Sequence, residues 1–279
     1  MNQSEESITQ AVIASLARAP EARTRRLLER LVVHLHAFVR ETEPSTDEWL
    51  AALEFLTAVG QKSDPRRQEF VLLSDSLGIS TLVDAIQNRK SPGATESSLL
   101  GPFFVAGAPE RAPGANIAQS QGSPLSVRGR VVSARGEPLP GATLEVWQTA
   151  ATGLYDVQDP TQPQYNLRGR FRADGEGRFA FESIKPVSYP IPSDGPVGRL
   201  LALLGRHPYR PAHIHFIVAA PGHRRVVTEL FDASDGYLES DVVFGVKPSL
   251  VVPFRRTSAD SEPPRYSLEY EFRLEPVEP

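Results

Sequence analysis

Two pairs of histidines with the same spacing occur among the six histidines of this 279-residue chain. His34 and His36 lie in a stretch with helical periodicity, where a step of two residues turns the side chains apart by about 200°. His213 and His215 lie in PAHIHFIV, a segment typical of a strand, where residues two apart project from the same face. The sequence therefore predicts that the second pair, and not the first, could bind one metal ion.

The chemistry of the strand pair stays open on this observation alone. Two hydrogen-bonded histidines on a polar sheet face are an equal alternative to a metal site. A carboxylate would complete a two-histidine iron site, and a third histidine would favour zinc. The chain has no cysteine, so disulfides and thiolate ligands are excluded, and any metal must be bound by nitrogen and oxygen atoms.

Tyrosines are a further source of oxygen ligands, and all seven lie beyond residue 150, in the same part of the chain as the second histidine pair. Tyr155 lies in TGLYD. Tyr189 lies in KPVSYPIP, where the prolines stiffen the backbone around the phenol. Tyr266 and Tyr270 alternate in a terminal strand and are interpreted as packing residues.

The elements that position these residues are indicated by an uneven distribution of proline and glycine. Residues 1–91 contain three prolines and two glycines, whereas residues 92–279 contain 22 and 18. Helical apolar spacing in the first part gives way to short alternating segments in the second. We therefore expect an α+β fold with three parts: a helical domain over 1–91, a Pro- and Gly-rich crossing segment over 92–124, and a mainly antiparallel β-sandwich over 125–279.

The first part is expected to form four or five helices. Ser45 and Glu48 make a capping box at the start of one of them. The helix around residues 27–39 is apolar over a wide arc, as expected either for a dimer seam or for the centre of a helical subdomain. In the second part the clearest strands are 125–128, 142–147 and 266–274, and the turn Asp174-Gly175-Glu176-Gly177 predicts a β-hairpin.

Composition argues against several classes of protein. The net charge of −4 does not favour nucleic-acid binding, which is typical of basic domains. No apolar run approaches the roughly 18 residues of a membrane span. The first residues, MNQSEESITQ, lack the basic and apolar regions of a signal peptide. We expect a cytoplasmic protein without a membrane span.

Four longer motifs follow one another in the chain: TESSLLGPFF, EVWQTAATGLYDVQDP, IKPVSYPIPSDGPVGRLLALLGRHPYRPAHIHF and SDVVFGVKPSL. In this order they resemble the intradiol ring-cleaving dioxygenases of the catechol 1,2-dioxygenase group. The segment FLTAVGQKSDPRRQEFVLLSDSLGISTLVDAI resembles that family as well, and within it most closely the hydroxyquinol-cleaving members. The resemblance implies a β-sandwich catalytic domain and a helical domain that forms a homodimer, often around a bound phospholipid.

The resemblance also implies one non-haem Fe(III) per chain, bound by Tyr155, Tyr189, His213 and His215. Trivalent iron is a hard cation that suits anionic phenolate oxygens. An aromatic diol would displace the phenolate of Tyr189, which can then accept a proton. The resemblance places Arg210 beside the substrate, where a cation stabilises developing negative charge; a surface salt bridge is the alternative.

Several positions match the family's substrate contacts. They are Leu72, Asp75, Leu99, Pro102, Phe103, Arg210, Val242 and Val243. The Asp75 carboxylate could accept a hydrogen bond from the third hydroxyl of hydroxyquinol and would be unpaired against catechol; exposure to solvent or a helix-capping role is the alternative. Glu229 departs from the Gln or His more usual near the metal in this family, and its charge could weaken the metal's pull on electrons.

The expected reaction is ring cleavage of hydroxyquinol (1,2,4-trihydroxybenzene) by dioxygen between the two hydroxyl-bearing carbons, giving 3-hydroxy-cis,cis-muconate, equivalent to maleylacetate, in aromatic compound degradation. Both oxygen atoms enter the product. The alternatives are a catechol 1,2-dioxygenase that forms cis,cis-muconate and a chlorocatechol 1,2-dioxygenase. More remote alternatives are a zinc hydrolase that uses His213, His215 and a carboxylate, and a non-catalytic β-sandwich binding module.

Overall fold

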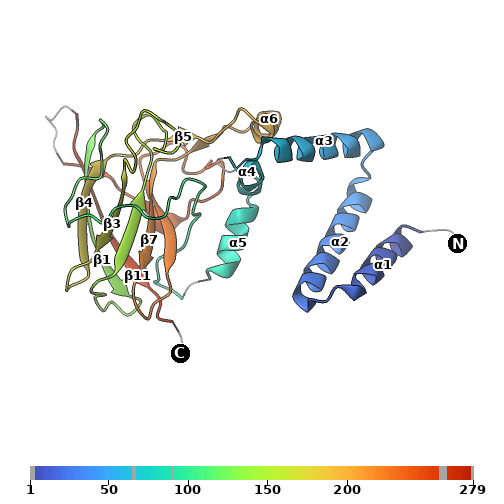
Figure 1. The fold of residues 1–279 in the computed structure, drawn as a ribbon, viewed down its shortest axis with the longest axis horizontal. Coiled ribbons are helices and arrows are strands. Elements are labelled where there is room, and N and C mark those ends of the chain that lie inside the picture. The colour runs from blue at the N-terminus through green and yellow to red at the C-terminus, as the bar shows by residue number, and fades with distance from the viewer. Residues whose placement is uncertain (1–3, 65–66, 90, 258–262, 278–279) are drawn as a thin grey trace. The chain divides into compact units, whose positions relative to one another are not determined.

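The structure is a computed structural model that describes residues 4–64, 67–89, 91–257 and 263–277. The chain divides into two compact units, Met1–Ala58 and Val59–Pro279. The first unit contains α1 (Glu5–Ser15), a 3-10 turn η1 (Leu16–Arg18), α2 (Ala22–Thr42) and most of α3 (Thr46–Lys62) (Figure 1).

Two helices of the first unit pack through a polar contact. The Thr9 hydroxyl of α1 lies 2.9 Å from Nδ1 of His36 and accepts a hydrogen bond of 2.9 Å from Arg40, both on α2. The predicted capping box is confirmed at the start of α3, where the Ser45 amide donates to the Glu48 carboxylate and the Glu48 amide donates back to the Ser45 hydroxyl. Each bond satisfies an amide that the helix itself leaves unpaired.

Two further helices, α4 (Glu69–Ser76) and α5 (Ile79–Gln87), belong to the second unit. Among the described residues before position 91 there are thus five α-helices, as predicted. Gly78, which joins α4 to α5, has a φ of 71°, a backbone conformation that glycine adopts at little cost. The boundary after residue 91, between the helical domain and the crossing segment, rests on composition and stays a prediction.

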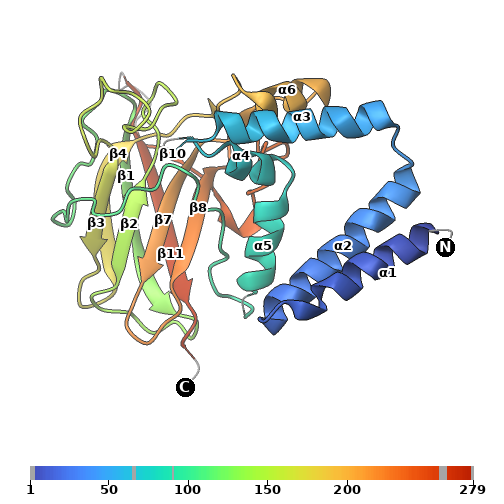
Figure 2. The same ribbon diagram turned by 45° about the vertical axis from the view of Figure 1, so that its right-hand side comes forward.

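The second unit is built on two sheets packed face to face (Figure 2). One has the strand order β10-β11-β1-β4 and the other β3-β2-β7-β8-β9, while β5 and β6 form a separate pair. The strands are β1 (Pro124–Ser133), β2 (Thr143–Trp147), β3 (Arg168–Arg172), β4 (Arg178–Ile184), β5 (Tyr189–Pro190), β6 (Tyr209–Arg210), β7 (His213–Ala219), β8 (Val226–Asp232), β9 (Val251–Val252), β10 (Arg255–Arg256) and β11 (Tyr266–Leu274). A helix, α6 (Pro196–Leu203), separates β5 from β6, and a 3-10 turn, η2 (Pro248–Leu250), precedes β9.

The mainly antiparallel β-sandwich is confirmed, and the three predicted strands lie in β1, β2 and β11. The predicted hairpin at Asp174 is wrong. The turn exists, with the Gly177 amide 3.0 Å from the Asp174 carbonyl, but β3 pairs with β2 while β4 pairs with β1 in the other sheet. The turn therefore carries the chain from one sheet to the other, and Phe171 of β3 and Phe181 of β4 stack in the core with ring centroids 5.0 Å apart.

Candidate metal centre

The two histidines of β7 are positioned by the strands on either side of them. β7 lies between β2 and β8, with His215 opposite Trp147 on one side and Glu229 on the other. The indole of Trp147 stacks on the His215 ring with centroids 4.7 Å apart. His213 and His215 are both buried, and their Nε2 atoms lie 3.1 Å apart, so the strand brings the two imidazoles to one point as predicted.

The two tyrosines reach the same point from separate loops. Tyr189 is held by the β5–β6 pair, in which it lies directly opposite Arg210. Tyr155 follows β2, and its phenol oxygen lies 3.3 Å from that of Tyr189 and 3.1 Å from Nε2 of His215. Gly153, with a φ of 78°, allows this loop to approach Tyr189, because a Cβ there would lie 3.1 Å from the Tyr189 Cβ.

The spacing of these four side chains fits a metal ion. Ligands at about 2.0–2.1 Å from a metal lie roughly 3 Å from one another, and the neighbouring donor atoms here are separated by 3.1–3.3 Å. Nδ1 of His213 lies 2.6 Å from the Pro211 carbonyl oxygen, which assigns the proton to Nδ1 and makes Nε2 the acceptor, with Arg210 Nη1 3.3 Å from it. Nδ1 of His215 lies 3.3 Å from a Glu229 oxygen but makes no hydrogen bond within the described residues.

Burial keeps the four groups neutral when no cation is bound. It raises the pKa of the Tyr155 phenol well above its ordinary value, and the neighbouring Tyr189 raises it further. Burial also raises the pKa of Tyr189, against the charge of Arg210, which lowers it. The pKa of His213 is lowered to about 4 by burial and by Arg210. Two buried phenols need a strongly charged cation to become phenolates, as a trivalent metal would provide.

Arg210 is enclosed by carboxylates and is not a surface residue. Its Nη1 donates to one Glu229 oxygen at 2.7 Å and its Nη2 to the other at 3.1 Å, while its Nε donates to Asp241 at 3.2 Å. Burial opposes its charge, but Asp241 and Glu229 hold the pKa of Arg210 well above its ordinary value. The charge of Arg210 in turn lowers the pKa of the Glu229 carboxyl, which burial alone would raise. A fixed cation therefore lies beside the candidate metal centre, and the carboxylates next to that cation are already bonded to it.

Asp75 lies in the same charged environment. It is 7% exposed, so the solvent-facing alternative is excluded. Burial raises the pKa of its carboxyl, while a hydrogen bond with Ser80 and the charge of Arg210 lower it, and Glu229 and Asp241 raise it. Asp75 lies within the last turn of α4, and the start of α5 has Gly78 at its N-cap with no side-chain cap hydrogen bond, so Asp75 does not cap α5.

The other predicted wall residues differ in what surrounds them. Leu72 lies one turn before Asp75 on α4 and is buried, as are Val242 and Val243. Phe103 stacks on the Tyr155 ring with centroids 4.7 Å apart. Leu99 is half-buried, whereas Pro102 is exposed.

Sequence reasoning missed several residues of this centre. Asp241 binds Arg210 and accepts the Gly245 amide at 2.9 Å. The hydroxyl of Ser98 donates to Glu229 at 2.5 Å and is buried. Trp147 covers one face of His215. Asp241 and Ser98 lie within the quoted motifs SDVVFGVKPSL and TESSLLGPFF, so their position in those motifs was the available signal.

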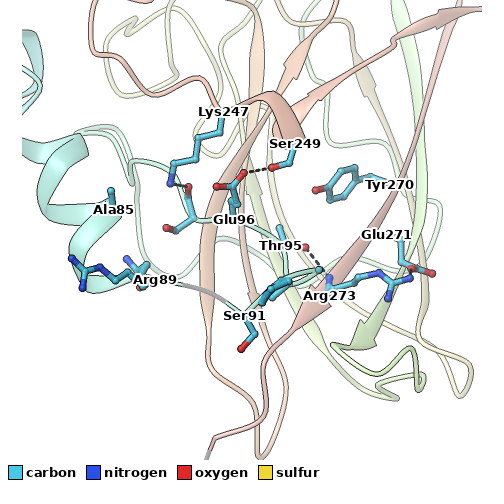
Figure 3. A pocket seen from close by; sticks show the side chains of 15 residues that line it. Ala85, Arg89, Ser91, Thr95, Glu96, Lys247, Ser249, Tyr270, Glu271 and Arg273 are labelled. Atoms are coloured by element: carbon cyan, nitrogen blue, oxygen red, sulfur yellow. Dashed lines mark hydrogen bonds and ion pairs between the residues drawn. The ribbon is translucent and has the colours of Figure 1, made fainter.

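A large cavity elsewhere in the second unit shares no residue with this centre. It has a volume of about 710 Å³ and lies between the end of α5, the segment 91–97 and β11. Figure 3 shows Glu96 bonded to Ser249 and the Thr95 hydroxyl bonded to the backbone of Arg273 at its wall. Its lining contains none of the four converging side chains, so we place the chemistry at the buried cluster and not in this cavity.

Comparison with known proteins assigns the chain to a family. The profile described as "Catechol dioxygenase N terminus" matches residues 21–95, and the one described as "Dioxygenase" matches residues 99–276. The chain belongs to the intradiol ring-cleavage dioxygenases. A hydroxyquinol 1,2-dioxygenase of Rhizobium sp. is 49% identical over 90% of this chain and 86% of that relative. A 6-chlorohydroxyquinol 1,2-dioxygenase of Cupriavidus pinatubonensis is 46% identical over 97% of each chain.

A solved structure extends this likeness to the fold. The crystal structure of a hydroxyquinol 1,2-dioxygenase from Pseudomonas putida has a TM-score of 0.93 and 48% identity, covering 98% of this chain and 99% of that chain. The intradiol dioxygenase described here therefore has the expected arrangement of N-terminal helices followed by a β-sandwich. None of its described helices is long and apolar enough to cross a membrane.

Proposed function

We propose that this intradiol dioxygenase cleaves hydroxyquinol to 3-hydroxy-cis,cis-muconate with one non-haem Fe(III) bound by Tyr155, Tyr189, His213 and His215. The observation that carries the metal assignment is the convergence of two phenol oxygens and two imidazole nitrogens at 3.1–3.3 Å. A bound ferric ion would act as a Lewis acid on the diol and as an acceptor of electron density from its ring.

A zinc site built from His213, His215 and Glu229 is the competing arrangement, since donor atoms of these three residues lie within 4.8 Å of one another. Both Glu229 oxygens are already bonded to Arg210, at 2.7 and 3.1 Å, and one also accepts the Ser98 hydroxyl. Using Glu229 as a ligand would break a buried ion pair, which is costly. The two phenols, which have no role in the zinc arrangement, complete the ferric one.

The chain's own residues would then act on the diol as follows. Tyr189, which would be a phenolate ligand of the bound ion, would serve as the base that takes a proton from a substrate hydroxyl. Arg210, which lies opposite Tyr189 in the β5–β6 pair, stabilises the negative charge that develops on the substrate. Phe103, stacked on Tyr155, provides an apolar surface near the ring and helps exclude water.

The preference for hydroxyquinol is proposed from Asp75. Its buried carboxyl is close enough to Arg210 for that charge to lower its pKa. A third substrate hydroxyl that faced this carboxyl would have a hydrogen-bond acceptor. Catechol would not supply this hydrogen bond and would leave the buried carboxyl with Ser80 alone as its hydrogen-bonding neighbour, at a cost of about 1–3 kcal/mol. The high identity to enzymes named for hydroxyquinol and 6-chlorohydroxyquinol supports this choice over catechol, and leaves chlorinated hydroxyquinols as substrates to test.

The test is oxygen uptake with hydroxyquinol, catechol and chlorocatechol, together with metal analysis of the purified protein. We expect stoichiometric iron, a visible tyrosinate-to-iron absorption band, and turnover of hydroxyquinol at least tenfold above catechol. A colourless protein with stoichiometric zinc would overturn the ferric assignment. A tenfold preference for catechol would overturn the substrate while leaving the reaction class intact.

We also propose that the enzyme is a homodimer joined through its N-terminal helices, with room for a phospholipid between them. The support is the apolar surface of α2, where Leu27, Leu31, Leu35 and Phe38 are all more than half exposed in the single chain. Sedimentation equilibrium and lipid extraction test the two parts separately. The cytoplasmic location stays a prediction from the sequence.

A further inference from the structure

Arg206 connects the two parts of the second unit that carry the predicted substrate contacts. It lies in the loop between α6 and β6 and is half-buried. Its Nη1 donates to the Ser76 carbonyl at 2.6 Å, next to Asp75, and its Nη2 donates to the Val242 carbonyl at 2.8 Å. One guanidinium thus bridges the end of α4 to the segment that contains Val242 and Val243.

The geometry of this bridge depends on the planar fork of the guanidinium. Two donors at a fixed separation bind two acceptors at once, which a lysine ammonium cannot reproduce with the same geometry. The guanidinium also lies over the Phe244 ring, 4.6 Å from its centroid. Phe244 has a φ of 58°, so the backbone beside Val243 is held in a conformation that non-glycine residues rarely adopt.

The other end of α4 is attached to the same helix, α6. Glu69, at the start of α4, accepts the backbone amide of Val197 at the start of α6, at 3.1 Å, and is completely buried. Arg206 follows the end of α6 and binds the end of α4. α4 is therefore held at both ends, and Arg206 makes the attachment nearer to Asp75.

The segment after Asp241 is attached to neighbouring elements at several further points. The Thr81 hydroxyl of α5 donates to the Val243 carbonyl at 2.8 Å, and the Ser98 hydroxyl donates to the Gly245 carbonyl at 3.0 Å. Lys247, labelled in Figure 3, donates to Asp84 of α5 at 3.0 Å. These bonds attach the segment after Asp241 to α5 and to Ser98, and not to α4. Within the described residues, the side-chain hydrogen bonds that link this segment to α4 are those of the Arg206 fork.

We propose that Arg206 is a positioning residue that sets the spacing between Asp75 and the Val242–Val243 wall, and thereby the preference for hydroxyquinol over catechol. The inference rests on the proposed hydroxyquinol specificity. A shift of Asp75 by a fraction of an ångström weakens a hydrogen bond to a third hydroxyl but removes nothing from catechol. Arg206 itself does not need to touch the substrate.

The experiment compares Arg206→Ala and Arg206→Gln with wild-type enzyme on both substrates. We expect kcat/KM for hydroxyquinol to fall about tenfold, mainly through a higher KM, and that for catechol to change less than threefold. Loss of an interaction that stabilises the bound substrate and the transition state equally raises KM and leaves kcat nearly unchanged. The control is Arg199→Ala on α6, an exposed arginine whose side chain makes no hydrogen bond or ion pair with the described residues.

A double-mutant cycle with Asp75→Ala separates positioning from general stability. If Arg206 acts through Asp75, its substitution in the Asp75→Ala background lowers the two substrates' kcat/KM equally. The inference would be overturned if Arg206 substitution lowered kcat/KM equally for both substrates in the wild-type background as well as in the Asp75→Ala background. This holds whatever the melting temperatures of the variants are. An unchanged substrate ratio in the milder Arg206→Gln variant would overturn it as well. The wild-type ratio tests the proposed specificity by itself, so the two failures are distinguishable.

Discussion

The two H-x-H pairs have the same sequence pattern and opposite surroundings. On β7, His213 and His215 are buried, their Nε2 atoms lie 3.1 Å apart, and phenols and carboxylates surround them. On α2, His36 bonds to Thr9 of α1, while His34 is exposed and lies 3.3 Å from Arg30 on its own helix. The strand repeat places side chains two apart together, and the helical repeat separates them.

Burial makes the difference between the two histidine pairs larger than the strand and helix geometry alone would. In the β7 cluster, a polar group has lost its water and depends on a few partners, so removing one partner leaves another unsatisfied. On the helix surface, water replaces whatever partner is lost. The comparison therefore predicts that equivalent substitutions have large effects in the buried cluster and small ones at exposed pairs.

The largest difference is expected between the histidine pairs themselves. His213→Ala or His215→Ala should remove iron and visible colour, and should lower turnover by more than the roughly 10–100-fold that loss of an outer partner costs. His34→Ala is the matched control and should leave iron content and turnover unchanged. Metal analysis and the visible spectrum measure both variants. A His215→Ala enzyme with full iron content would contradict the ligand assignment.

A second test compares a buried ion pair with an exposed one. Glu229→Gln leaves the fully buried Arg210 with Asp241 as its remaining carboxylate and should lower kcat roughly 10–100-fold while iron stays bound. Glu110→Gln breaks an exposed pair with Arg172, whose side chains are 53% and 56% exposed, and should leave kcat unchanged. Steady-state oxygen uptake measures both. Equal effects of the two substitutions would mean that burial does not govern the result.

Asp75→Ala should have a smaller and more selective effect. Loss of one hydrogen bond to a charged group, ~1.5 kcal/mol, corresponds to about a tenfold lower kcat/KM for hydroxyquinol. Catechol, which lacks the third hydroxyl, should be little affected. Parallel kinetics on the two substrates give the ratio, with Asp84→Ala, whose carboxylate binds Ser97 and Lys247, as a structural control. Equal losses on both substrates would assign Asp75 a structural role.

The smallest effect is expected at the exposed Asp194. Hydrogen bonds from Arg67 and Lys62 lower the pKa of its carboxyl from 3.8 to about 2. Between these values the unfolded chain binds more protons than the folded one, so the stabilisation is present above about pH 4 and is lost as the pH falls towards 2. Asp194→Asn should lower the urea midpoint slightly at pH 6 and not at pH 2.5. A larger loss at the lower pH would reverse the assigned sign.

Much of the fold followed from local patterns. The capping box at Ser45 and Glu48, the helical and strand periodicities, and the opposite behaviour of the two histidine pairs all depend on neighbours within a few residues. The prediction of a hairpin at Asp174 was wrong, because a turn motif predicts the bend in the chain and not the strand with which the next strand pairs. In the fold β3 pairs with β2 and β4 with β1, and Phe171 and Phe181 of β3 and β4 stack between the two sheets.

By itself, the sequence determined which residue types were available for chemistry. With no cysteine, and with Tyr155, Tyr189, His213 and His215 in family motifs, a nitrogen and oxygen metal site was the expected result. The surroundings of that site depend on how distant parts of the chain pack together. The bonds from Glu229 to Arg210 and from Arg206 to α4 join residues 19 and 130 positions apart. Such contacts form when separate elements pack together, so no local pattern encodes them.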